Sequence, residues 1–550
     1  LLLHVYAQLF EEGHKPVSLK WSYPSAMSNN LIRQYIQIWT KLGDVNPLNE
    51  TPNLIVFNPI TSMNISNGSS WGAPTKENTG GWGTSSEPAA TPTESGWGTP
   101  VVAPTAGGWG NDSAVTPSNN PAQNTLKEIK TDSGPIDFNF KVLGSEESLT
   151  ESCAVANYIA NSARVSTNML NLTICFDVGG STTDIMALCN MMGPQGPGLA
   201  MVKQNSIRFA AQRVAQATKH SPNFKAVMVE MCERKKITIQ GLNKGENKFN
   251  ANTAPYYFEQ LVDRLDETDF NSFYQLLAGK CPELMSVNLY VTGLIMFYAG
   301  QLAAKLRSEV INSPSKLPGM ENWKPIVNIV FAGKGARIFD WLKANNAQHS
   351  KEYYETLFIK GFGGMSVAQQ LLSGPPNINP TNADGSNDIK YEVSKGLAQT
   401  TQKLYVPQKH TAIELLGEDN FIVLSPSGQQ KQIKSEESIT PEMMESIESY
   451  FLSSPSQGGF PCPKFMEFAD VYFKIATGMF GLPLTQEDFM QGFNNMNIGS
   501  YIKQLPEYKQ AQESKQKGDS EVFDFVAPII ILEGMKFLEE VIYKKIATKN

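Results

Sequence analysis

The stretch ICFDVGGSTTDIMAL, residues 174–188, constrains the fold more than any other part of the chain. An apolar strand carries Asp177 near its end, a Gly-Gly turn follows at 179–180, three hydroxyl residues come next, and an apolar strand resumes after Asp184. Because glycine has no Cβ, the backbone N–H groups of such a turn can approach a phosphate closely, and the hydroxyl groups add donors. The pattern predicts a β-hairpin whose tip binds an anion, with a plain glycine turn as the alternative.

Asp177 is the residue of this hairpin that we expect to hold a cation. Hard cations such as Mg²⁺ prefer carboxylate oxygen, bound directly or through water. The spacing is not that of a P-loop, which requires GxxxxGK[ST] followed by a helix. A magnesium-assisted phosphate site outside the P-loop class is therefore the prediction.

A second glycine-rich turn follows another buried strand, in VNIVFAGKGARIFDWL at residues 327–342. The turn contains Gly333, Lys334 and Gly335, and we expect a helix to begin there. The positive end of a helix and a close backbone approach favour an anionic or planar ligand. Turns of this kind are common between strands and helices, so an ordinary connection is an equal alternative for this motif alone.

The composition is typical of a globular protein that contains a polar segment. Hydrophobic residues make up 41% of the 550 residues, and this length allows about three to five structural units. The net charge of −7 argues against non-specific binding to nucleic acid, which needs many Lys and Arg. The six cysteines and five histidines are scattered, which fits a reducing, cytoplasmic environment and predicts neither a disulfide framework nor a zinc site.

Apolar runs give no candidate for a membrane span. The longest uninterrupted candidate, residues 525–532, ends at Glu533, whereas a span needs about 18–20 residues. We therefore expect no membrane-spanning segment.

The order of patterns along the chain predicts an α/β protein. Residues 1–48 read as helix, strand (VSLKWSYP) and helix, and strands and helices alternate again from 135 to 403, with an apolar helix at 286–309 and a third strand of the hairpin sheet in NSIRFAA, 205–211. Residues 404–434 read as a short β stretch, and the remainder reads as helices. The run 525–546 has a mixed apolar and charged face; a helix packed on the core is the first interpretation and a partner-docking helix the second.

Residues 51–134 differ sharply from the rest of the chain. They are rich in Gly, Ser, Thr, Pro and Asn, and they cannot bury enough apolar surface to offset the entropy of ordering. A flexible linker is the first interpretation. The second is a protein-partner site, since tryptophan buries a large area in a pocket. Four of the eight tryptophans lie here, at irregular spacing: Trp71, Trp82, Trp97 and Trp109.

Together, the two glycine motifs resemble the ATPase superfamily of actin, heat-shock chaperones and sugar kinases. DVGGSTTD resembles its second phosphate motif and FAGKGARI its adenosine motif, in the same order and about 150 residues apart. Three further stretches agree. The family's strand–turn–helix is resembled by VSLKWSYPSAMSNNLIRQYIQIW, and its first connecting motif by LTESCAVANYI. Its second connecting motif, where small residues let two helices cross, is resembled by the helix around Gly293 and Gly300. The resemblance covers about 14–50 and 135–400 and implies a two-lobed fold of ribonuclease H-like sheets flanked by helices.

The resemblance also implies domain limits. Residues 1–50 and 135–185 would form the first lobe, interrupted by a disordered insertion at 51–134. Residues 186–403 would form the second lobe with the adenosine motif, and 404–550 would be a short β stretch with a mostly helical C-terminal extension.

Site residues are likewise implied by the resemblance. Asp177 would orient Mg²⁺ and its water shell, and Glu151 would help to place the attacking water, so these two would be catalytic. Arg337 would stack on the adenine as a flat cation. Nucleotide contacts would come from Gly179, Gly180, Ser181, Thr182, Thr183, Asp184, Gly333, Lys334, Gly335, Ala336 and Arg337, and from Glu233 and Lys236 in CERKK, a stretch that could equally be a solvated helix face.

The chain departs from the family pattern in two places. The first phosphate motif, D-x-G-[ST], is absent; because the chain begins at Leu1 without Met, we expect that hairpin to precede it, with loss of the hairpin as the alternative. Lys334 stands where the chaperones place a second glycine.

The leading hypothesis is an ATP-binding actin- or chaperone-like ATPase that hydrolyses Mg-ATP between two lobes to switch conformation and partner binding. The alternative is a nucleotide-binding filament or scaffold protein, capable of self-assembly, with little turnover. A small-molecule kinase would need a carboxylate base aimed at a substrate hydroxyl, and the sequence identifies none. A degenerate member that does not hydrolyse ATP is disfavoured by the retained Asp177 and GGSTTD.

Overall fold

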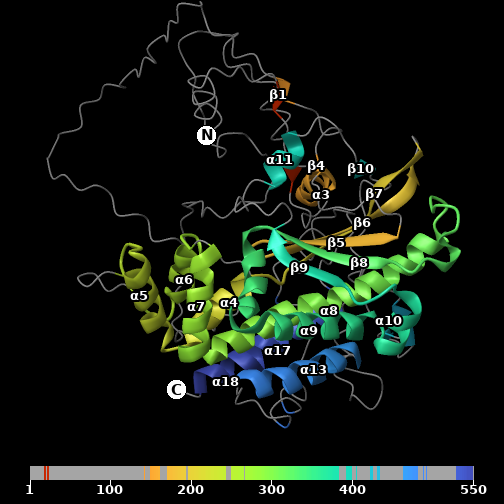
Figure 1. Cartoon of the computed structure of the whole chain (residues 1–550). Coiled ribbons are helices and arrows are strands. Elements are labelled where there is room, and N and C mark those ends of the chain that lie inside the picture. The colour runs from red at the N-terminus through yellow and green to blue at the C-terminus, as the bar shows by residue number, and fades with distance from the viewer. Residues whose placement is uncertain are drawn as a thin grey trace, which may run out of the picture. The chain divides into compact units, whose positions relative to one another are not determined.

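Figure 1 shows the computed structural model of the chain. The structure describes residues 18–19, 22–23, 37, 141–142, 149–161, 170–193, 196–242, 249–265, 267–382, 392–398, 404–405, 421–424, 430–433, 463–480, 487, 491, 504, 509 and 528–548. The predicted helices near residues 1–13 and 31–43, the tryptophan segment 51–134 and residues 435–452 of the part expected to be helical lie outside these residues or almost entirely so.

A mixed sheet of six strands forms the centre of the described structure, in the order β10-β7-β6-β5-β8-β9. Antiparallel pairing joins β5 to β6 and β6 to β7, whereas β8 is parallel to β5, β9 to β8 and β10 to β7. The α/β class is therefore confirmed. The strands are β5 (Asn171–Val178), β6 (Thr183–Gly193), β7 (Gly196–Ile207), β8 (Ile326–Ala332), β9 (Asn377–Asn382) and β10 (Leu404–Tyr405).

The central strands are the apolar runs of the sequence. Every residue of β5 is buried except Asp177, which is partly exposed, because helices cover both faces of the strand. The expected strands at 172–178, 183–188 and 325–333 are confirmed. The third hairpin strand, expected at 205–211, instead occupies 196–207: Gly196, with φ +103°, turns the chain directly into β7, and the surrounding Gly and Pro concealed its start.

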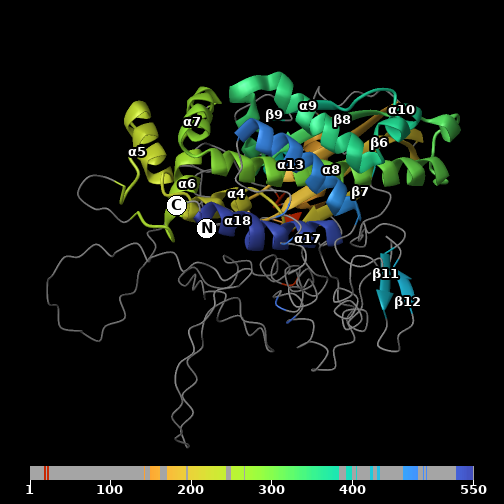
Figure 2. The same ribbon diagram turned by 90° about the horizontal axis from the view of Figure 1, so that it is seen from below.

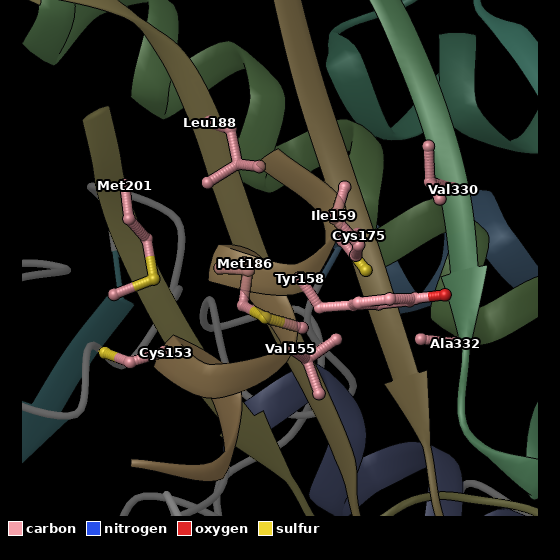
Figure 3. Close-up of a cluster of buried hydrophobic side chains, with 11 residues drawn as sticks. Cys153, Val155, Tyr158, Ile159, Cys175, Met186, Leu188, Met201, Val330 and Ala332 are labelled. Atoms are coloured by element: carbon pink, nitrogen blue, oxygen red, sulfur yellow. The ribbon is translucent and has the colours of Figure 1, made fainter. Parts of the chain in front are cut away.

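Helices cover the two faces of this sheet (Figure 1). On one face, α3 (Glu151–Asn161) lies over the strands, and α11 (Glu392–Ala398) packs on α3. Figure 3 shows Tyr158 reaching from α3 across β5 toward Ala332 of β8, within a buried cluster that also contains Met186 and Met201. The hairpin strands are thus held rigidly by a continuous apolar layer.

The other face is covered by α8 (Pro282–Asn312) and α9 (Lys343–Phe362). The predicted apolar helix at 286–309 is confirmed within α8. By length and composition α8 could cross a membrane, which the count of uninterrupted apolar runs overlooked, but 89% of its most apolar window is buried inside the protein. It is the core helix of this layer.

The remaining described helices pack on α8, on α9 or on one another. They are α4 (Gln212–Ala217), η2 (Thr218–His220), α5 (Phe224–Lys235), α6 (Ala254–Val262), α7 (Glu267–Lys280), η3 (Met320–Asn322), η4 (Lys334–Leu342), α10 (Met365–Leu371) and α13 (Pro463–Phe480), followed by α17 (Ile529–Phe537), the π-helical turn η6 (Leu538–Ile542) and α18 (Tyr543–Thr548). The C-terminal helix packs on α8 and α13, so the first interpretation of residues 525–546 is confirmed for the part described.

Three pairs of short strands lie outside the six-stranded sheet in the described part of the chain. The described elements fall into two compact units: β1 (Ser18–Leu19) pairs in parallel with β3 (Lys141–Val142) in one, and β2 (Ser22–Tyr23) pairs in parallel with β4 (Leu149–Thr150) in the other, which also holds the sheet. A separate hairpin consists of β11 (Phe421–Leu424) and β12 (Gln430–Ile433), within the β stretch expected at 404–434. The lobe boundary expected after residue 185 falls inside β6, a strand that the structure keeps in the same sheet as β5 and β8.

Candidate functional site

The two glycine turns lie against each other at one edge of the sheet. The parallel pairing of β5 with β8 sets Asp177 opposite Ala332, so the turns that follow the two strands emerge side by side. Gly333 has φ +76°, and a Cβ there would overlap Asp177 Oδ1; a Cβ at Gly335 would overlap the carbonyl oxygen of Gly179. The 333–335 turn therefore needs glycine at both positions because its backbone passes directly over the first turn.

The tip of the β5–β6 hairpin is tight and open to solvent. The Gly179 N–H donates to the carbonyl oxygen of Thr182 (2.8 Å), which closes the turn. Gly180 and Ser181 are exposed, and a Cβ at Gly180 would meet nothing within 4 Å. Space for a ligand thus exists where the motif predicts a phosphate.

Not all of the expected phosphate-binding hydroxyl groups face this opening. The Thr183 side chain is buried, and its hydroxyl donates to the carbonyl oxygen of Phe209 (2.8 Å). Thr182 is partly exposed. Thr183 therefore fixes the start of β6 to the chain after β7, and Ser181 and Thr182 are the hydroxyl residues left at the tip.

Four carboxyl groups influence one another beside the hairpin. Asp177 and Asp184 are directly opposite in the β5–β6 ladder, while Glu151 begins α3 and Glu392 begins α11. Burial, followed by the charges of Asp184, Glu392 and Glu151 in that order of size, raises the pKa of Asp177 to about 8. Burial, and then Asp184, also raises the pKa of Glu151. The arrangement concentrates negative charge that a cation would relieve.

The helix that presents Glu151 has a well-defined start. Thr150 Oγ1 accepts a hydrogen bond from the Cys153 N–H (3.0 Å), the capping interaction that satisfies a free amide of the first turn. Thr150 in turn donates to Gln204 Oε1 on β7 (3.0 Å). Glu151 is therefore held next to the sheet by its neighbour Thr150.

Glu392 was missed by the sequence analysis, and so was the helix crossing that positions it. The small-residue crossing expected at Gly293 and Gly300 of α8 is present and is made with α9, where a Cβ would overlap Tyr353 and the Phe358 backbone, respectively. A second close crossing, which the sequence analysis did not predict, joins α11 to α3: a Cβ at Gly396 would overlap the Ala154 carbonyl oxygen, and Asn157 Nδ2 donates to the Gly396 carbonyl oxygen (2.9 Å).

The adenosine-like turn continues into η4, so the helix expected there begins as a 3₁₀ helix. Arg337 Nη1 donates to the Leu265 carbonyl oxygen (3.0 Å), and its guanidinium lies 4.5 Å from the centre of the Phe270 ring. Lys334 forms an ion pair with Asp263 at the end of α6, and Ala336 is buried. The flat cation that the resemblance assigns to the adenine is present, and its aromatic neighbour is Phe270 of α7.

Glu233 and Lys236 lie at the C-terminal end of α5. Lys236 adopts φ +54° as the residue that ends the helix, and α5 packs on α6 and α7. Arg337 contacts Phe270 of α7 and Leu265 of the segment before it. The fainter assignment of Glu233 and Lys236 to the nucleotide stays a prediction.

The carboxyl groups fit a cation that is only partly coordinated by protein. Within the described ranges, no group of three or more His, Cys, Asp and Glu residues is placed to hold a metal ion. Mg²⁺ commonly uses one or two carboxylates and completes its shell with water and substrate phosphate oxygens. Asp177 beside an open glycine turn fits that mode of binding.

A scan against protein-family models gives no match for this chain, and no curated protein matches it.

Proposed function

We propose that this chain binds Mg-ATP at the paired glycine turns and hydrolyses it, as an ATPase of the actin and chaperone type. The observation that carries the proposal is the contact between the two motifs. Gly333 and Gly335, about 150 residues away in sequence, lie on Asp177 and Gly179 at the ends of adjacent strands. Each motif alone could be an ordinary turn. The contact between the two turns is more readily explained by a ligand that both of them bind.

The strand order adds support. A meander of three antiparallel strands, β5, β6 and β7, followed by β8 and β9 added in parallel on the other side of β5, is the order typical of ribonuclease H-like sheets. The two-lobed arrangement remains part of the proposal.

We assign a different part of Mg-ATP binding and hydrolysis to each group of residues at and beside the hairpin tip. The N–H groups and hydroxyl groups of 180–182 would bind the β- and γ-phosphates, and Asp177 would hold Mg²⁺, which neutralises phosphate charge when bound. Glu151 would hold the attacking water. The high pKa of Asp177 means that the carboxyl is largely protonated at neutral pH without a cation, so cation binding would release its proton.

The base would lie at the other turn. Arg337 has one face on Phe270 and a fixed position through its bond to Leu265, which makes it a preorganised planar surface for stacking. We place adenine beside Arg337 and the phosphates beside Gly180.

The test measures Mg-ATP binding and phosphate release by the full chain, by Asp177→Ala and by Asp470→Asn, a control at an exposed carboxylate on α13 paired with Lys474. We expect wild type and Asp470→Asn to bind and turn over alike, with a loss of about 100-fold or more in Asp177→Ala, the scale of removing a transition-state charge partner. Tight binding without turnover would favour the filament or scaffold alternative, to be checked by ATP-dependent sedimentation. Absence of binding would overturn the nucleotide site.

A further inference from the structure

The phosphate hairpin is connected to the C-terminal helix through α4. The Gly180 carbonyl oxygen, at the tip, accepts a hydrogen bond from the Gln212 N–H at the start of α4 (2.7 Å). The next residue, Arg213, donates from Nη1 to Glu539 Oε1 (2.6 Å), and the Tyr543 hydroxyl donates to the Arg213 carbonyl oxygen. The first turn of α4 therefore contacts both the hairpin tip and the C-terminal helix.

The contacts of Arg213 are partly shielded from water. Its side chain is only 16% exposed, and Nη2 lies 3.4 Å from Met535 Sδ. Tyr543 is buried, with its ring stacked on His220 at 5.3 Å between centroids. A charge-assisted bond in such surroundings is stronger than a surface ion pair, so a displacement of α4 would pull on the C-terminal helix through Arg213 and Glu539.

The segment that meets α4 is a π-helical turn. Residues 538–542 form η6 between α17 and α18, and Glu539 lies within it. Single π turns are rare and frequently lie at functional sites. The wider turn also changes which side chains of the helix face α4, so a return to α-helix would withdraw Glu539 from its present position.

The C-terminal helix is also anchored on the core, at Gly534. The Tyr290 hydroxyl of α8 donates to the Gly534 carbonyl oxygen (2.8 Å), and Leu294 packs where a Cβ at Gly534 would lie. Figure 2 shows α17 and α18 running along this side, with α4 beside α18. A helix that is fixed to the core at Gly534 and bonded to α4 at Glu539 and Tyr543 can respond to a shift of the glycine turn, which α4 contacts through Gln212, by a local change of helix form.

We propose that the C-terminal helix, residues 529–548, responds to the γ-phosphate at the hairpin tip, with Arg213 as the positioning residue that transmits the change. This inference depends on the proposed nucleotide site. By thermodynamic linkage, contacts of the helix must then alter the preference of the site for a triphosphate over a diphosphate.

The test compares dissociation constants for Mg-ADP and a non-hydrolysable Mg-ATP analogue in wild type, Glu539→Gln and Glu540→Gln. Glu540 is the matched control, since it lies on the same π turn but pairs with Lys536 of its own helix. We expect the ratio of the two constants to change about fivefold or more in Glu539→Gln, the lower range of allosteric coupling, and to stay unchanged in Glu540→Gln. Tyr543→Phe, which removes the second contact to α4, should change the ratio in the same direction.

Hydrogen–deuterium exchange supplies the second measurement. In wild type, exchange in 529–548 should differ between the two nucleotides, and the difference should disappear in Glu539→Gln. If nucleotides bind but the ratio and the exchange are the same in all variants, the coupling is wrong while the site stands. If wild type binds neither nucleotide, the proposed function and this inference are both overturned.

Discussion

Asp177 is destabilising in the nucleotide-free protein when it is ionised. An aspartate in an unfolded chain has a pKa of about 3.9, whereas burial and three neighbouring carboxyl groups raise the pKa of Asp177 to about 8 in the folded state. Between these values the unfolded state binds fewer protons than the folded state, so the free energy of unfolding falls as pH rises. Asp177 therefore lowers the free energy of unfolding by nothing below about pH 4, where it is protonated in both states. The decrease reaches its full size above about pH 8, where it is ionised in both states.

Asp177→Asn should therefore stabilise the nucleotide-free protein more at pH 8 than at pH 5. We expect a relative gain of about 1–2 kcal/mol, reduced from the full shift because the side chain is partly exposed. Urea unfolding at pH 5 and pH 8 measures it. Asp470→Asn, at the exposed carboxylate on α13, is the control; an equal pH dependence in all three proteins would contradict the burial of an acidic group at the hairpin.

The crossing of α3 and α11 is the element-scale feature on which the carboxyl cluster depends. Gly396 allows the backbones to touch at Ala154, and Glu392 lies one helical turn earlier on the same helix. A Cβ at Gly396 would push α11 away from α3 and carry Glu392 with it. The contact between the two helices thus positions Glu392 in the cluster.

Gly396→Ala and Gly279→Ala should have effects of opposite sign. Overpacking at the crossing should cost about 1–3 kcal/mol. Gly279, in α7, has nothing within 4 Å of its Cβ position, so alanine there should add about 0.5–1 kcal/mol through helix propensity. Chemical unfolding of both variants gives the comparison, and a neutral or stabilising Gly396→Ala would refute the close contact. With the loss of Glu392 from the cluster, Gly396→Ala should also weaken the pH dependence assigned to Asp177.

How far the sequence predicted these elements depends on the range of the interactions that form them. Strands β5 and β8 and helix α8 were predictable because their apolar patterns are local. The start of β7 was not, since its Gly-Pro composition indicates a loop and only pairing with β6 makes it a strand. Glu392 and Gly396 were missed because a seven-residue helix has too little periodicity, and its partner is more than 200 residues away.

At the scale of the whole molecule, the C-terminal helices belong to the same core as the sheet-covering layer. Phe537 of α17 lies 6.0 Å from Tyr290 of α8 and 6.0 Å from Phe465 of α13, measured between ring centroids. Both Phe537 and Tyr290 are fully buried. Residues far apart in sequence therefore share one aromatic cluster, and we expect α8, α13 and α17 to unfold together.

Phe537→Ala tests this cooperativity. The cavity should lower the free energy of unfolding by about 3–5 kcal/mol, the cost of removing a buried phenylalanine. Because hydrogen exchange of the most protected amides follows global unfolding, the loss should appear equally in α17 and in β5, which lies on the far side of α8 from the substitution. Lys544→Ala, at an exposed position of α18, should change neither. If Phe537→Ala raises exchange only in α17 and leaves β5 protected, the C-terminal helix is a separately folding attachment, and its coupling to the hairpin would have to act by docking and undocking instead of through a shared core.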